Sequence, residues 1–545
     1  MAVFDWIRDY YRRILRNSLG AVFRSPVYPY TLYRPTPKEL QFTPKSSDSG
    51  DVVRGEGILS GRFDFGELGE FTSIDPWAAE LPNNDIAVKL HTFKWLDDVA
   101  AVADTDTAKR RIRSLVNDWL LLNSRWSAPA WEGPVLAARI SKWLEHYDQY
   151  FAKSSRTLRT RLLRQIAVQL VHLNRLSEIE LDGAEKFISL KALIYGAICL
   201  PGKDKKFRQL MAKLEREIDR QVLSDGGHIS RSPSEQGTVL QSLIDIRRAI
   251  VGSQNQVPDS LQRAIDRMSP MLRFFRHQDG GLALFNGSRE EDAKSIDSTL
   301  IQADARGQPP RSAPDSGFER LLAGRLLVLA DTGSPAKLVR SGGAHAGTLS
   351  LEISVGQERM IVNCGAARAS DANWQMVQRT TAAHSTLSVE DRNSSELLKD
   401  GGIGRCAEIV SSLRQDTDTA LSFEARHNGY LSIFGLEHSR EVRVLKNEEI
   451  IIGDDTLSAT GEFQFALRFH LHPDVAVSLA QGGSSALLKL TKGGGWRFSV
   501  SGADMQIEDS IYLGGHQTKR TNQIVLSGKT NSETMTIQWS IEPAC

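Results

Sequence analysis

Hydrophobic residues recur with two different periods along the chain. Between about residues 86 and 275, apolar residues return every three to four positions, as at Ile112, Leu115, Val116 and Trp119. This spacing puts them on one face of an α-helix, and the pattern repeats in segments joined by short connections. The first half therefore predicts an array of helical hairpins, which can close into an α/α toroid.

From about residue 319 to the end, the period is mostly two. In the segment 349–355, leucine, isoleucine and valine share one parity, while Ser350, Glu352 and Ser354 share the other. Alternation of this kind is typical of strands with one buried face. Repeated strands separated by turn residues predict a large antiparallel β-sandwich. The fold class is therefore α+β and multidomain, an N-terminal α/α toroid followed by a C-terminal antiparallel β-sandwich.

Stretches rich in Pro, Gly and Ser mark the boundaries. Residues 25–60 are an extended arm, and 287–317 are a linker or long loop. We predict an N-terminal helix and arm over 1–60, a toroid over 61–317 and a sandwich over 318–545. His345 opens one predicted strand and His384 another, while Asn363 and Cys364 close a third. Neighbouring strand ends can bring these four side chains to one cleft, although histidines at strand ends are often surface residues.

Composition narrows the function classes. The chain has 545 residues with a net charge of +1, so no overall field favours nucleic acid. Its 4 scattered cysteines indicate reduced thiols. Residues 1–24 form an amphipathic, arginine-rich segment that either packs on the protein or contacts a membrane surface. They lack a clear secretory signal, which favours the cytoplasm, with the cell envelope or periplasm as the alternative.

Several motifs resemble the heparinase II/III family of polysaccharide lyases. In the second half these are AHAGTLSLEIS, MIVNCG, TAAHSTLSVED and RFHLHPDV, and in the first half SDGGHISRSP, HTFKWLDDVA and PAWEGPVLAARISKWLEHY. The resemblance implies the same toroid and sandwich, and β-elimination on a uronate-containing acidic polysaccharide. It also implies a structural zinc in the β-domain. His345 and His384 match the zinc ligands, Asn363 stands where an aspartate is expected, and the adjacent Cys364 offers a thiolate.

The expected catalytic positions are altered. Ala184 and Glu185 stand where the family has Asn and His, and Glu235 replaces the tyrosine of its S-P-x-Y-H motif. A lyase needs a group that neutralises the uronate carboxylate and groups that move protons. Arg231 is the candidate neutraliser, and His228 or Glu235 the candidate base. The same stretch also reads as a helix–helix turn, with Ser232 as the cap and Pro233 as the first helical residue.

Aromatic rings stack on sugars, so Trp126, Trp131 and Trp374 are candidate substrate-binding residues, and Arg379 is a candidate contact for an anionic chain. Tryptophan on a helix stripe is usually core, and a single arginine is usually a solvated charge.

Three functions remain open. The first is a polysaccharide lyase with a rearranged site. The second is a non-catalytic glycan-binding or envelope-assembly protein on the same fold. The third is a glycoside hydrolase that uses Glu185 and Glu235 as its acid and base.

Overall fold

The computed structural model describes residues 22–102, 105–179, 181–336, 343–367, 372–398, 401–492, 494–531 and 533–544. Most of residues 1–24, the predicted amphipathic segment, lie outside this set. The chain forms two compact units. The first contains the residues up to 219 together with 241–263, and the second contains 220–240 together with 264 onward. No helix in the described ranges is both long and apolar enough to cross a bilayer.

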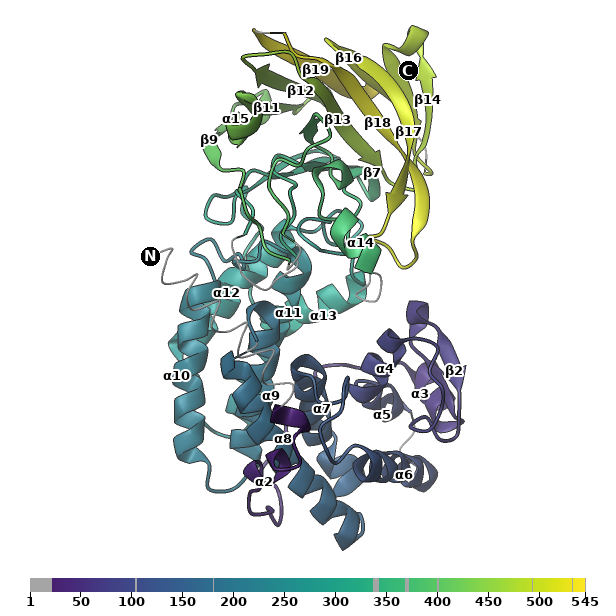
Figure 1. Ribbon diagram of the computed structural model, residues 1–545, viewed down its shortest axis with the longest axis vertical. Helices are drawn as coiled ribbons and strands as arrows, with labels where there is room; N and C mark the ends of the chain where they lie inside the picture. Colours follow the sequence, from purple (N-terminus) through teal and green to yellow (C-terminus); the bar gives the residue numbers. More distant parts are fainter. Residues whose placement is uncertain are drawn as a thin grey trace. The chain divides into compact units, whose positions relative to one another are not determined.

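The first unit is helical, as the period of its apolar residues predicts (Figure 1). Helix α6 (Asp106–Leu122) shows why, because Ile112, Leu115 and Trp119 all point into the core and are at most 1% exposed. The other elements that lie in it wholly or in part are α2 (Tyr28–Thr31), α3 (Val52–Leu59), β1 (Arg62–Asp64), β2 (Glu70–Thr72), α4 (Asn84–His91), α5 (Leu96–Ala101), α7 (Gly133–Glu145), α8 (Arg156–Ile179), α9 (Gly183–Cys199), α10 (Asp204–Gln221), α11 (Pro233–Gly252) and α12 (Asp259–Phe274).

One predicted helix is divided in two. The apolar pattern over 87–102 predicts a single helix, whereas the chain forms α4 and α5 with a break between them. Phe93 lies in the break with φ +58°, a left-handed conformation that non-glycine residues rarely adopt. Its ring is fully buried and contacts Trp95 and Trp143, so aromatic packing holds the turn in place.

A buried ammonium group ties the arm to the helices of the first unit. Lys142 Nζ lies 2.7 Å from Asp97, 2.8 Å from Glu145 and 3.0 Å from Asp48 of the arm. Burial would raise the pKa of Asp97, but the hydrogen bond from His146 and the charge of Lys142 lower it to about 2. Asp97, Glu145 and His146 are close enough together to hold a metal ion. Because Lys142 already supplies the positive charge among them, this cluster is an internal ion-pair network.

The second unit is a β-sandwich with short helices (Figure 1). One antiparallel sheet has the strand order β14-β15-β16-β19-β12-β11-β10-β9, and the other β17-β18-β13-β7-β6-β5-β4-β3, with β8 paired to β13. The strands are β3 (Ser312–Ala313), β4 (Phe318–Ala323), β5 (Leu326–Asp331), β6 (Leu351–Val355), β7 (Glu358–Val362), β8 (Leu387–Val389), β9 (Ile409–Asp416), β10 (Ala420–Tyr430), β11 (Leu436–Leu445), β12 (Ile450–Ser458), β13 (Gln464–Leu471), β14 (Ala476–Ala480), β15 (Ser485–Lys489), β16 (Gly495–Ser501), β17 (Asp504–Tyr512), β18 (Lys519–Lys529) and β19 (Thr534–Pro543). Helices α13 (Ala293–Ala303), α14 (Ala372–Val377) and α15 (Leu431–Phe434) complete it.

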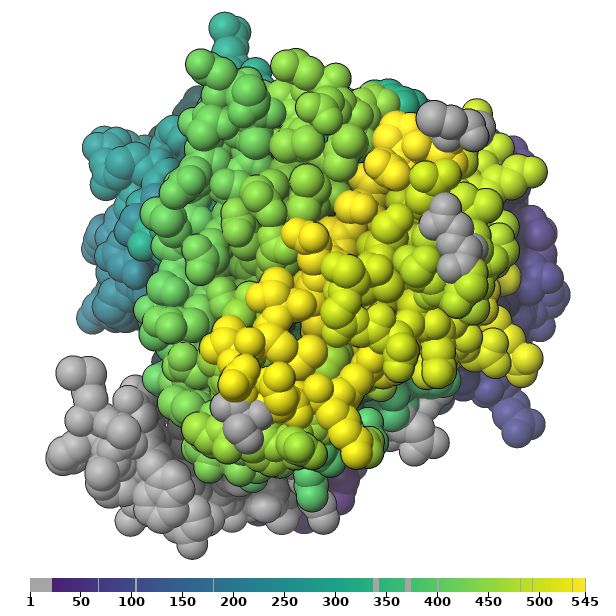
Figure 2. All heavy atoms as spheres, turned by 90° about the horizontal axis from the view of Figure 1, so that it is seen from above, coloured from purple at the N-terminus to yellow at the C-terminus, as the bar shows by residue number. Residues whose placement is uncertain are grey.

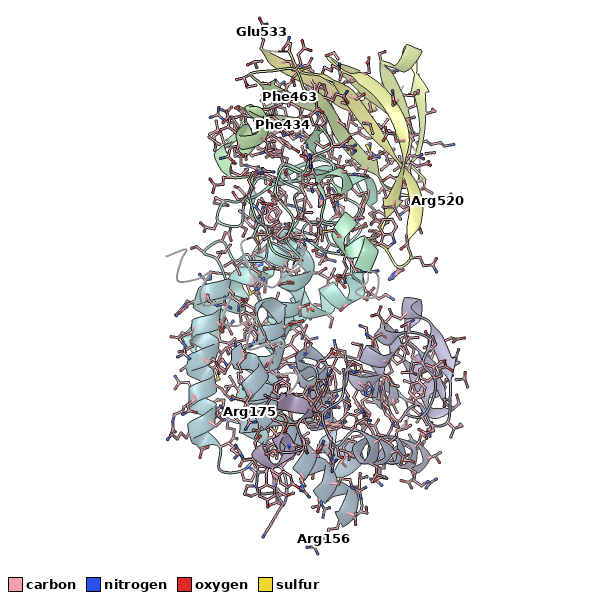
Figure 3. All side chains as sticks on the ribbon, in the orientation of Figure 1. Arg156, Arg175, Phe434, Phe463, Arg520 and Glu533 are labelled. Atoms are coloured by element: carbon pink, nitrogen blue, oxygen red, sulfur yellow. The ribbon has the colours of Figure 1, made fainter. Side chains whose placement is uncertain are left out.

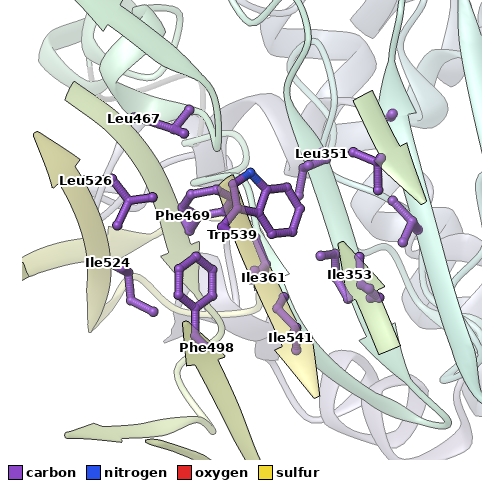
Figure 4. Packing of buried hydrophobic residues seen from close by; sticks show 14 of the residues in the cluster. Leu351, Ile353, Ile361, Leu467, Phe469, Phe498, Ile524, Leu526, Trp539 and Ile541 are labelled. Carbon is purple, nitrogen blue, oxygen red and sulfur yellow. The ribbon is translucent and has the colours of Figure 1, made fainter. Parts of the chain in front are cut away.

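The core lies between the two sheets. Phe469 of one sheet packs against Phe498 and Trp539 of the other, with ring centroids 5.1 Å and 5.0 Å away (Figure 4). The strands of this unit are the green to yellow spheres in Figure 2. Burying each such aromatic side chain contributes about 1.5–3 kcal/mol.

Two sequence-based expectations differ from the structure in this unit. The segment 287–317, predicted to be a linker, contains α13. The short apolar run in GGLALFNGS, residues 280–288, is typical of a buried strand, but the described chain forms no strand there and Leu282 makes only an isolated bridge with Arg276. Leu282, Ala283, Leu284 and Phe285 are nevertheless buried, so their apolar character reflects packing and not a strand.

Candidate functional site

The loop before α11 and the first turn of that helix together hold three of the four predicted catalytic residues: His228 and Arg231 in the loop, and Glu235 in the helix. Asp225 turns the chain, accepting a hydrogen bond from the Gly227 N–H at 2.9 Å and from the Ser316 N–H at 2.6 Å. Gly227 permits this approach, because an added Cβ would lie 1.8 Å from Ser316 Oγ. The loop is thus fastened to the segment that leads into β4.

His228 and Glu235 come together, as the sequence predicts for a shared loop. Nδ1 of His228 lies 3.6 Å from a Glu235 carboxylate oxygen and 2.7 Å from Ser230 Oγ. Nε2 of His228 lies 3.1 Å from Gln221 Oε1. The His228 side chain is fully enclosed, whereas the Glu235 side chain is 28% exposed in the first turn of α11. Only Glu235 of this pair is therefore accessible to a ligand.

Arg231 fastens the loop to the sandwich, and protein groups engage its hydrogen-bond donors. Its guanidinium donates to the carbonyls of Ser316 at 2.7 Å, Gly317 at 3.0 Å and Ser334 at 2.8 Å. It also pairs with Asp331, whose pKa is raised by burial despite this neighbouring positive charge. Because Arg231 is 7% exposed and so engaged, the structure corrects its predicted role as neutraliser of a uronate carboxylate.

A cavity of about 490 Å³ opens beside Arg231. Its lining includes Arg231 itself, Asp315 and Ser316 of the β3–β4 turn, and Glu319 and Arg414, which form an ion pair at 2.9 Å. No aromatic side chain lines it among the residues described, so it lacks a stacking platform for a pyranose ring.

The hydrolase hypothesis requires Glu185 and Glu235 to act on one bond. Glu185 is exposed in the first turn of α9 and belongs to the first unit, whereas Glu235 belongs to the second. Neither unit alone contains the pair, so a separation that would set the stereochemistry is not defined within either.

The two predicted zinc histidines do meet. His345 Nδ1 lies 3.0 Å from His384 Nε2, and His384 Nδ1 lies 2.7 Å from the Thr380 carbonyl (Nδ1–H must donate there). His384 Nε2 then accepts from His345, which leaves His345 Nε2 without a hydrogen-bond partner in the described residues. Burial lowers the pKa of His384 to about 4, and burial together with His384 and Arg379 holds the pKa of His345 well below its usual value.

Asn363 and Cys364 do not complete a zinc site. The Asn363 amide donates to Glu352 Oε1 at 3.0 Å, and its oxygen accepts from the Ser385 N–H at 3.0 Å. Cys364 Sγ instead lies 3.6 Å from His470 Nδ1, and burial raises the pKa of its thiol to about 12.

Zinc in proteins takes three or four protein donors. Within the described ranges, no Cys, Asp, Glu or third His joins His345 and His384 in a cluster of ligand atoms. An aspartate at position 363 would also face the Glu352 carboxylate. The residues present therefore do not fit the structural zinc that the sequence predicts.

The predicted sugar-binding residues divide into buried and half-buried groups. Trp131 is 1% exposed with its indole N–H on the Asn123 carbonyl at 3.0 Å, so it is core. Arg379 is 3% exposed and donates to the carbonyls of Ala344, Gly401 and Gly402. These two assignments are therefore corrected. Trp126 is half-buried beside Phe23 and Arg24, and Trp374 is half-buried on α14.

Sequence reasoning missed a charged network inside the sandwich. Arg440 of β11 donates to Asp455 of β12 at 2.8 Å, and His438 lies 2.6 Å from the same carboxylate. The Trp539 indole donates to Asp455 as well, at 2.8 Å. A signal was available, because His438 and Arg440 share the parity of Val442 and Val444 and so belong to the buried face.

Comparison with known proteins identifies the family. Residues 61–306 match the heparinase II/III N-terminus, and residues 305–540 match the heparinase II/III-like C-terminal domain. FtsZ-localized protein C of Caulobacter vibrioides is 30% identical over 538 residues, which cover 94% of this chain and 91% of that protein.

Solved structures give the same fold at lower identity. Heparinase III is similar with a TM-score of 0.71 at 12% identity, covering 95% of this chain and 90% of that one. The heparan sulfate lyase HepC of Pedobacter heparinus is similar with a TM-score of 0.59 at 14% identity, covering 98% and 87%. The predicted α+β class is thereby confirmed, and the chain belongs to the heparinase II/III-like family.

Proposed function

We propose that this protein is a non-catalytic member of the family, a binding protein of envelope assembly that is recruited to the division site together with FtsZ. The relative named for its localisation with FtsZ matches 94% of this chain at 30% identity, whereas the lyases compared above share 12% and 14%. We place the protein in the cytoplasm. The amphipathic residues 1–24 are its proposed contact with a membrane surface.

The observation that carries the non-catalytic part of the proposal is that protein groups engage the guanidinium of Arg231. Removal of the C5 proton of a uronate builds negative charge on the carboxylate, and a lyase must hold that charge with donors aimed at it. Arg231 instead donates hydrogen bonds to the carbonyls of Ser316, Gly317 and Ser334 and to the carboxylate of Asp331. Arg379 likewise donates to three main-chain carbonyls.

Localisation in cells tests the proposal. A fluorescent fusion of the full chain should gather at the division site and should leave it when FtsZ is depleted. The Glu235→Gln variant should localise like the natural protein, because no proton transfer is required of it. A fusion that stays diffuse, or that follows the periplasm, contradicts the proposal.

A second candidate is a lyase that acts on a uronate-containing acidic polysaccharide. It is favoured by the 3.6 Å approach of His228 to the accessible Glu235, because such a pair can exchange a proton. Incubation with acidic polysaccharides would then produce unsaturated sugar ends with near-ultraviolet absorbance. Glu235→Gln should lower that rate by at least about 100-fold if Glu235 is the base. Binding of an acidic saccharide without cleavage supports the non-catalytic function instead.

A further inference from the structure

The hairpin of α8 and α9 carries a groove of about 610 Å³ that none of the functions above uses. We name it the α8–α9 groove. It runs along the two helices, is closed on one side by residues 34–37 of the arm, and ends at residues 200–206. Its floor is apolar and consists of Ala167, Leu170, Val171, Leu193, Gly196, Ala197 and Leu200.

Helical spacing explains this floor. On α8, Ala167, Leu170 and Val171 lie one turn apart, and on α9 Leu193 and Ala197 do the same. Gly196 lets the helices approach closely, because an added Cβ would lie 2.5 Å from Leu170 Cδ1. The groove is thus a built feature of the hairpin.

The rim is uniformly basic. Arg34, Arg175, Lys203 and Lys206 line it, and the lining contains no Asp or Glu. Arg175 is oriented by hydrogen bonds to the Thr31 carbonyl at 3.0 Å and hydroxyl at 2.8 Å, and lies on α8 in Figure 3. Lys206 Nζ binds the neutral Asn174 Oδ1 at 2.8 Å. Burial and the nearby charge of Lys213 lower the pKa of Lys206, and Glu178 only partly offsets this shift.

We propose that the α8–α9 groove binds a short acidic segment of a partner protein. Apolar side chains of that segment enter the floor, and its carboxylates pair with the basic rim. Charge complementarity supports this occupant, because the lining offers four cations and contains no carboxylate. The inference rests on the proposed function, since recruitment by a partner requires a surface that recognises one.

The depth of the floor favours a peptide over a membrane. Leu193, Ala197 and Leu200 are 4%, 7% and 3% exposed, so they are recessed below the rim. A bilayer presents a flat surface that cannot reach them, whereas a peptide side chain can enter. Residues 167–175 of α8 span ~12 Å, which is the length of about two helical turns or four extended residues.

Fluorescence anisotropy with the full chain tests the groove. The probes are two labelled peptides of equal length, one of alternating Leu/Phe and Glu/Asp residues and one with Lys in place of the acids. We expect the acidic probe to bind and the basic probe not to bind. The double variant Lys203→Glu/Lys206→Glu should weaken binding by about tenfold or more, because attraction becomes repulsion. Val171→Asp should weaken it similarly by placing a charge on the apolar floor.

Lys205→Glu is the matched control, since Lys205 is exposed between the two rim lysines and does not line the groove. It should leave binding unchanged, and thermal unfolding should show all variants folded. The proposal is overturned if the acidic probe fails to bind, or if the groove variants bind as well as Lys205→Glu does. It is also overturned if the groove lysines are required for binding to anionic phosphatidylglycerol vesicles but not for binding to the peptide. Failure of division-site localisation with intact peptide binding would overturn the proposed function alone.

Discussion

Two pairs of buried histidines lie in the second unit, and they differ in what each pair is bonded to. His345 and His384 approach to 3.0 Å, and His427 and His438 to 3.2 Å. Both pairs are almost completely buried. In the second pair the Gly429 N–H donates to His427, His427 donates to His438, and His438 donates to Asp455, so every nitrogen has a partner.

The hydrogen-bond chain through the first pair has different groups at its two ends. It runs from His345 Nε2, which has no partner in the described residues, to the neutral carbonyl of Thr380. The second ends on a carboxylate that is also paired with Arg440. The comparison teaches that family-motif positions do not identify the more strongly held polar group, because the charges that hold it, Arg440 on β11 and Asp455 on β12, lie outside those motifs.

Removing the anion of the second pair should have the largest effect. Burial alone would raise the pKa of Asp455, but Arg440 and His438 lower it to about 2, so the group is a buried carboxylate. Asp455→Ala leaves the Arg440 charge without its counter-ion and should reduce the free energy of unfolding by about 3–5 kcal/mol. Urea unfolding followed by tryptophan fluorescence measures this.

The exposed Asp504 on β17 provides the control, and Asp504→Ala should change stability by less than about 0.5 kcal/mol. Equal effects of the two substitutions would mean that the internal network contributes nothing beyond a surface charge.

Lowering the pH should reduce the stability of the folded protein through the first histidine pair. The pKa of His384 is about 4 in the folded protein, below its ordinary value of 6.5. The unfolded chain therefore binds more protons between these values, so stability falls as the pH drops through this window. From about pH 7 to about pH 5, His384 alone should account for a loss of about 2 kcal/mol.

In His384→Gln this contribution is absent, so the pH dependence of the unfolding free energy should be shallower by that amount. An unchanged slope would show that His384 does not titrate in the window.

Restoring the expected aspartate should have the smallest effect. Asn363→Asp places a carboxylate against Glu352 and removes a buried N–H donor, which should lower the free energy of unfolding by about 1–2 kcal/mol.

Zinc should not raise the melting temperature of the natural protein, because its histidine pair lacks a third ligand. Stoichiometric zinc in the purified natural protein, measured by mass spectrometry of metals, would refute this.

The sequence predicted both halves of the fold because periods of 3.6 and two report directly which face is buried. It did not predict the break at Phe93, since that left-handed turn depends on packing against Trp143, which is distant in sequence. His228 and Glu235 could be placed together because one short loop holds both. The role of Arg231 could not be predicted, because Asp331 and Ser334 lie about 100 residues away and only the folded sheet brings them near.

The arm, predicted to be extended, contains α2 and α3, and its contact with Lys142 shows a further role for the segment between them. Asp48 supplies one of the carboxylates around that ammonium group, and Ser46 donates to Asp97 at 2.8 Å. A shortened chain that starts after this segment would expose the ion cluster to water and loosen the ends of α5 and α7. The proline-rich arm is therefore part of the helical domain, and a shortened chain meant to contain that domain should include the arm.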